Sequence, residues 1–113
     1  MGDRRMAELR TSDGSLYFYT HSYGESLPNL AIEALDIASS RKGDSPYALR
    51  RIVDHLIKAT GSRDNEIGSG LSLSPDGGED SYIVSTDKNS DYVMVHDSLV
   101  SVLIDLDEWC VYY

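Results

Sequence analysis

The chain has 113 residues, of which 41% are apolar, and this is enough for a single folded domain with one core. Its formal charge is −9, and residues 74–113 hold nine acidic residues and one lysine, a composition that repels phosphate and argues against nucleic-acid binding by that part. No apolar run approaches the roughly 20 residues that span a bilayer, and the N-terminus lacks the apolar stretch of a secretory signal. The single cysteine, Cys110, excludes an internal disulfide. We therefore expect one domain, residues 1–113, in the cytoplasm and away from membranes.

A β-hairpin is predicted over residues 6–20. The pair Asp13-Gly14 is typical of the type I′ turn that joins two antiparallel strands. Alternation of apolar with polar residues on both sides of the pair gives each strand one core-facing side. A turn at this pair places Leu9 opposite Phe18 on the core side and leaves a second face that is aromatic and charged.

Two helices are predicted next, over residues 27–41 and 44–61. Ser26 is the expected N-cap of the first helix and Ser45 that of the second, while Gly61 is the expected left-handed stop. The second helix carries an apolar stripe at helical spacing, made of Leu49, Ile52, Val53 and Leu56. Because the connection is short, the two helices are expected to pack as an antiparallel pair.

The C-terminal half is predicted to add strands. Short strands are expected near residues 71–73, at 81–86 and at 92–96. Residues 97–113 fit two patterns. As a strand, the alternating residues are Val100, Val102, Ile104 and Leu106; as a helix, one face holds Leu99, Val102, Leu103, Leu106, Trp109, Cys110 and Tyr113. We predict a helix because it accounts for more residues, although the β-branched content favours a strand.

These elements predict an α+β fold. Its antiparallel sheet would combine the N-terminal hairpin with the C-terminal strands. The helical hairpin and the C-terminal helix would pack on one face of that sheet. The aromatic C-terminus, with Trp109, Val111, Tyr112 and Tyr113 among the last five residues, would dock on the core or on a second copy of the chain.

No complete catalytic, metal or cofactor pattern is found in the sequence. The run Asp87-x-Asn89-x-Asp91 lacks the Gly and Glu that an EF-hand loop requires at its sixth and twelfth positions. One cysteine and three separated histidines give no zinc spacing. The sequence therefore predicts no catalytic residue, no metal and no cofactor.

One candidate ligand-binding cluster stands where the hairpin meets the first helix. Its members are Tyr19, His21, Tyr23 and Glu25. Aromatic and histidine side chains beside a helix N-terminus can bind a small anion or a peptide. The alternative is a structural histidine whose ring is hydrogen-bonded to the loop.

The same region carries a resemblance. The matching residues are Tyr19-Thr20-His21-Ser22-Tyr23-Gly24, Leu27-Pro28, Ala34-Leu35, Arg41, Asp44, Pro46-Tyr47, Arg51-Ile52 and Gly68-Ser69-Gly70-Leu71-Ser72. This pattern, spanning roughly residues 16–86, resembles a set of small bacterial and phage proteins with a Tyr-x-His-x-x-Gly-x-x-Leu-Pro loop. The resemblance implies an accessory protein of a phage or mobile element, and it implies no reaction.

Three functions are consistent with these observations. The first is a non-catalytic binding or interaction protein, a homodimer that meets an unknown protein partner through its acidic C-terminal third. The second is a small enzyme or ligand-binding domain that uses His21. The third is an acidic inhibitor that mimics DNA, which requires regularly spaced acids on one face. We take the first as the prediction and keep the other two as alternatives.

Overall fold

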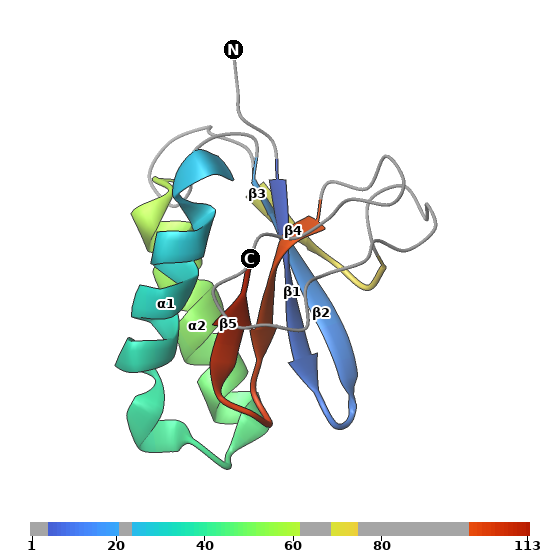
Figure 1. Cartoon of the computed structure of the whole chain (residues 1–113), viewed down its shortest axis with the longest axis vertical. Coiled ribbons are helices and arrows are strands. Elements are labelled where there is room, and N and C mark those ends of the chain that lie inside the picture. Colours follow the sequence, from blue (N-terminus) through green and yellow to red (C-terminus); the bar gives the residue numbers. More distant parts are fainter. Residues whose placement is uncertain (1–4, 21–23, 62–68, 75–99) are drawn as a thin grey trace.

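A computed structural model of the chain describes residues 5–20, 24–61, 69–74 and 100–113, and all structural statements concern these residues. Within them, a five-stranded sheet has the order β3-β2-β1-β4-β5, and two helices lie side by side on one of its faces (Figure 1). The strands are β1 (Arg5–Thr11), β2 (Gly14–Thr20), β3 (Ser69–Ser72), β4 (Val100–Asp105) and β5 (Cys110–Tyr112). The helices are α1 (Leu27–Ile37) and α2 (Ser45–Ala59), with short 3-10 turns η1 (Gly24–Ser26) and η2 (Ser39–Arg41). The predicted α+β class is confirmed.

The sheet is mostly antiparallel, as predicted, with one exception. The pairs β1–β2, β2–β3 and β4–β5 are antiparallel, whereas the central strands β1 and β4 are parallel. A bulge at the start of this parallel pair, between Met6 and Ala7, sends Val100 and Val102 to opposite faces. The strands predicted at 81–86 and 92–96 lie outside the described residues, and the one expected near 71–73 is found as β3.

The N-terminal hairpin is confirmed, but its register differs from the prediction by two residues. Leu9 pairs with Leu16 instead of Phe18, because the loop consists of Ser12 and Asp13. The Thr11 hydroxyl accepts a hydrogen bond from the Asp13 amide at 3.0 Å and donates one to the Gly14 carbonyl at 3.1 Å. Asp13 does not adopt the positive φ that a type I′ turn at Asp13-Gly14 requires. A shift of two residues preserves the faces, so the aromatic and charged side is as predicted.

Both predicted helices are present and run in opposite directions (Figure 1). The first α-helix ends at Ile37 and continues as η2, so it is shorter than the 27–41 predicted. The second is capped by Asp44 instead of Ser45, and neither α-helix has a side-chain hydrogen bond at its cap. Gly61, with φ 76°, supplies the expected left-handed stop after α2.

The predicted C-terminal helix is wrong. Residues 100–112 form the strands β4 and β5 instead, and a tight turn joins them. In that turn the Asp105 carboxylate accepts hydrogen bonds from the Asp107 and Glu108 amides, each at 2.9 Å, and Trp109 takes a positive φ of 58°. The strand alternative, which the β-branched residues favoured, is therefore the one observed.

One core fills the space between the helices and the sheet. Its fully buried members include Ala48, Ile52 and Leu56 on α2, Leu27, Ala31 and Ala34 on α1, and Ala7, Leu9, Phe18, Val102 and Ile104 on the strands. Val111 of β5 also belongs to it, and Trp109 and Tyr113 pack against it in part. The aromatic C-terminus therefore docks on the chain's own core.

We expect replacement of Val111 by Ala to lower the free energy of unfolding by on the order of 2 kcal/mol, because it removes buried methyl groups from the core. Tyr112→Phe is the matched control: it changes the neighbouring residue of the same strand, on the opposite face, and loses the hydrogen bonds of the hydroxyl with Glu108 and Cys110. Urea unfolding of both variants measures the effect. Equal stability of Val111→Ala and the parent chain would contradict the docking of β5 on the core.

Candidate functional site

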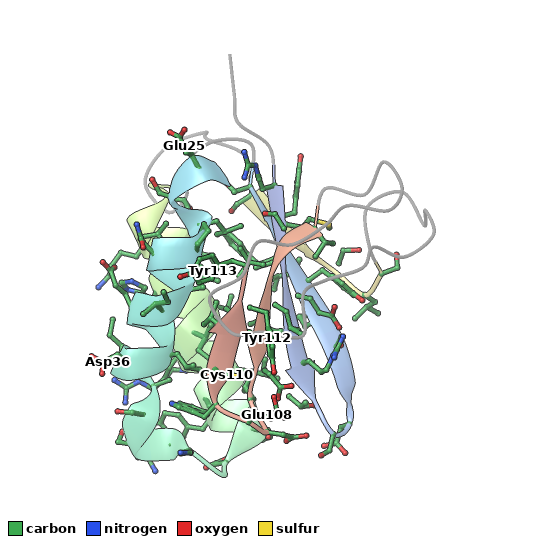
Figure 2. All side chains as sticks on the ribbon, in the orientation of Figure 1. Glu25, Asp36, Glu108, Cys110, Tyr112 and Tyr113 are labelled. Atoms are coloured by element: carbon green, nitrogen blue, oxygen red, sulfur yellow. The ribbon has the colours of Figure 1, made fainter. Side chains whose placement is uncertain are left out.

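The structure describes two of the four residues of the predicted cluster. Tyr19 stands near the end of β2, on the sheet face that points away from the helices, and packs against Met6, Tyr17 and Val100. Its ring carbon Cδ2 would lie 3.5 Å from a Cβ placed on Gly70, the residue opposite it on β3. Glu25 is exposed in η1, at the N-terminal end of α1 (Figure 2). His21 and Tyr23 lie outside the described residues, so the cluster stays a prediction.

A groove lined mainly by aliphatic side chains lies on the other side of the sheet, where α2 passes over β2 and β3. We call it the apolar groove. It has a volume of about 340 Å³ and is lined by Leu16 of β2, Leu71 of β3, and Leu49, Arg50, Val53, Asp54 and Ile57 of α2. Leu71 is 53% exposed although it faces α2. A second hollow at the hairpin turn shares Leu16 and Leu49 and extends the apolar surface to Leu73, which is 86% exposed.

The groove exists because α2 has two parallel apolar stripes. Ala48, Ile52 and Leu56 repeat every four residues and are fully buried in the core. The adjacent stripe of Leu49, Val53 and Ile57 has the same spacing but is only partly buried, beside β3, the outermost described strand on that side. The sequence predicted an apolar face for this helix, but the pattern alone does not show that the described strands bury only one of its two stripes.

A polar depression adjoins the apolar groove across α2. We call it the cationic hollow. It has a volume of about 310 Å³ and is lined by Ile37 of α1 and by Arg50, Arg51, Asp54, His55 and Lys58 of α2. Three lysine or arginine side chains therefore line the hollow together with one carboxylate. At the margin of the hollow, His55 Nε2 lies 3.2 Å from a carboxylate oxygen of Glu33. Arg50 and Asp54 line both the hollow and the apolar groove.

Arg50 is also part of an aromatic stack at the start of α2. The Arg41 guanidinium carbon lies 4.0 Å from the centre of the Tyr47 ring, and that of Arg50 lies 5.3 Å from it. Both distances are within the range of cation–π attraction. The stack helps to fix the Arg50 side chain at the boundary of the two depressions. From the sequence, Arg41 and Arg51 stood out only as residues of the resemblance, and none of the cations of α2 was predicted to belong to a site.

The sheet face that points away from the helices carries a buried carboxylate. Glu8 is 3% exposed and accepts a hydrogen bond of 2.6 Å from the Ser15 hydroxyl. The Arg10 guanidinium donates to both Glu8 oxygens, from Nε at 3.2 Å and from Nη2 at 3.5 Å. These partners compensate the charge, as a buried carboxylate requires. Burial, and next the Glu8 charge, raise the pKa of Tyr17, while Arg10 lowers it.

The β4–β5 turn holds a second tyrosine–carboxylate pair. The Tyr112 hydroxyl donates a hydrogen bond of 2.7 Å to Glu108 (Figure 2). This hydrogen bond, followed by one to Cys110, raises the pKa of Tyr112 well above its usual value. Because the pair is exposed and its members are neighbours in one turn, its arrangement supports the local structure of the turn.

Neither a metal site nor a membrane-spanning helix is found in the described ranges. No group of three His, Cys, Asp or Glu side chains in them is placed to hold a metal ion. No helix among them has the length and apolar character needed to cross a bilayer. His55 lies at a partly buried position on α2. His96 lies outside the described residues.

The comparisons with known proteins give no match: no protein-family model, no curated protein and no solved structure is similar to this chain.

Stability should fall as the pH rises above about 10, the usual pKa of tyrosine. The raised pKa of Tyr17 means that the folded state keeps the phenol proton after the unfolded chain has lost it. The stabilisation is therefore complete below the unfolded pKa and is lost as the pH passes through the folded one. We expect Tyr17→Phe to lose less stability than the parent chain between about pH 9 and about pH 11.

Urea unfolding at both pH values measures this effect. Tyr112→Phe is the comparison: it removes the other tyrosine with a raised pKa, so it should also lose less stability than the parent chain, while the contribution of Tyr17 stays in place. A loss of stability as large in Tyr17→Phe as in the parent chain would show that Tyr17 does not contribute.

Proposed function

We propose that this protein is a non-catalytic binding module and that the apolar groove between α2 and the strands β2 and β3 is its binding surface. The observation that carries the proposal is the half-exposed Leu71 within a groove lined mainly by aliphatic side chains. Binding sites combine a mostly apolar concave surface with a few polar groups that orient the ligand. Here Arg50 and Asp54 are the polar groups at the rim.

The chemistry of the groove supports binding more than catalysis. Five of its seven lining side chains are aliphatic and can only exclude water from a ligand. Arg50 and Asp54 can orient a polar ligand group by charge and hydrogen bonds. The alternative, an enzyme or ligand-binding domain built on Tyr19, His21, Tyr23 and Glu25, stays a prediction, as does the acidic mimic of DNA.

The setting of the module is part of the proposal. The buried Cys110, which forms no disulfide, supports a reducing compartment, and we place the protein in the cytoplasm. The resemblance in residues 16–86 supports an accessory protein of a phage or mobile element. The acidic C-terminal third, of which Asp105, Asp107 and Glu108 are exposed or partly exposed in the β4–β5 turn, supports a second contact with a basic protein partner.

A charge introduced into the apolar groove should weaken peptide binding. We expect peptides selected from a displayed random library on the parent chain to bind Leu71→Glu at least about tenfold more weakly, because a carboxylate in the apolar groove must be desolvated. Ile32→Glu is the matched control: Ile32 is 43% exposed on α1, away from the groove, and should bind as the parent chain does. Fluorescence anisotropy measures the affinities.

The proposal is wrong if no peptide is enriched on the parent chain. It is equally wrong if the selected peptides bind the parent chain and Leu71→Glu with the same affinity. Thermal melting of each variant shows that it is folded before binding is compared, and the exposed position of Leu71 makes a folded Leu71→Glu variant the expected result.

We also propose that the chain forms a homodimer through its C-terminal segment. The supporting observation is that β5 is the outermost strand of the described sheet, with Tyr112 partly exposed on it. An edge strand offers unpaired backbone groups to a second copy, and a two-fold axis brings the same residues together. The aromatic face of the hairpin, with Tyr17 and Tyr19, lies on the same side of the sheet as Tyr112.

We expect the intact chain to sediment as a dimer at concentrations on the order of tens of micromolar. Tyr112→Lys should shift it towards monomer, since the two-fold axis would bring the introduced ammonium groups together. The control Ile32→Lys places the same charge on α1 and should stay dimeric. A monomeric parent chain, or a Tyr112→Lys variant as dimeric as the control, would contradict the proposed interface.

A further inference from the structure

We infer that the apolar groove and the cationic hollow form one composite site on α2, and that its ligand is an acidic segment of a partner protein that carries a large apolar side chain. The inference rests on the proposed function, because it uses the same groove. It adds the chemical class of the partner and assigns a role to Arg50, Arg51 and Lys58.

The two depressions adjoin on opposite flanks of α2. Both are lined by Arg50 and Asp54, so one ligand can enter the groove and the hollow by crossing a single boundary on α2. Within the hollow, Arg51 and Lys58 are seven residues apart on the same helix, which is about 10 Å along its axis. An extended segment of about three residues spans that distance. The site is therefore long enough for a peptide with an anchor and neighbouring charges.

The charges select an acidic ligand. The chain as a whole has a net charge of −9, yet the hollow gathers Arg50, Arg51 and Lys58 around the single carboxylate Asp54. Its lining holds three cations and one anion, a net charge of about +2, or about +1 with Glu33 beside His55, and this charge attracts acidic side chains and repels basic ones. A planar guanidinium such as Arg51 can bind a carboxylate through two hydrogen bonds.

The groove restricts the ligand to a protein segment. Its aliphatic lining gives no partner to a phosphate or a sugar, whereas a leucine, methionine or aromatic side chain would cover Leu71, Val53 and Ile57 and exclude water from them. A nucleic acid would also meet the overall charge of −9. Peptide recognition by an apolar anchor beside charged residues matches both halves of the site.

The test uses the intact chain and the displayed random-peptide library. The enriched peptides should have Asp or Glu next to a large apolar residue, and their affinity should fall as salt is added. Arg51→Glu should lower the affinity for these peptides by about fivefold or more, while the affinity for a fully apolar peptide stays the same. Lys42→Glu, which changes the net charge equally at an exposed position that lines neither depression, should bind as the parent chain does.

Several results would overturn the inference and leave the proposed function standing. Enriched peptides that lack acids, or an affinity for acidic peptides that is the same in Arg51→Glu and Lys42→Glu, would show an apolar site without the cationic half. A dimer of the parent chain that Leu71→Glu converts to monomer would assign the site to a second copy of the chain. Failure of every peptide to bind the parent chain would instead remove the proposed function itself.

Discussion

The packing of α2 on the sheet fixes the position of every surface described above. Ala48, Ile52 and Leu56 are fully buried against the strands, so the rotation of the helix about its axis is set by the core. A helix places residues four apart on one face, so the neighbouring stripe of Leu49, Val53 and Ile57 lies together on the flank beside β3. The groove beside Leu71 and the cationic hollow on the other flank are consequences of that one orientation.

The two faces of the sheet satisfy different constraints. The face towards the helices is apolar and holds the main core. On the other face, the central strand β1 buries Glu8, a group that is stable out of water only when its charge is compensated. Arg10 and Ser15 supply that compensation from positions that the hairpin register places opposite each other. The observed register thus orders both the core and this polar network, and a one-residue slip would bury the wrong side chains on both faces.

Local signals in the sequence predicted the elements better than their pairing. Both helices and the hairpin were predicted because capping, apolar period and alternation act over a few residues. The hairpin register was missed because the side chain of Thr11 closes the loop, a contact that the Asp13-Gly14 pair does not indicate. The C-terminal strands were predicted as a helix because a short apolar run fits both periods. Pairing with β1, and the turn held by the Asp105 carboxylate, decide that case.

The candidate site was harder to predict than the fold, for a physical reason. The apolar face of α2 is visible in the sequence, but its division into a buried and a partly buried stripe depends on how the helix packs on the described strands, which only the tertiary structure determines. The same holds for Arg50, Arg51 and Lys58, whose spacing resembles that of any solvated helix face until Ile37 of α1 closes one side of the hollow. The chain is strongly acidic as a whole, yet it gathers Arg50, Arg51 and Lys58 beside an exposed apolar surface. This local positive charge is the reason why we propose a partner segment with acidic residues beside a large apolar side chain.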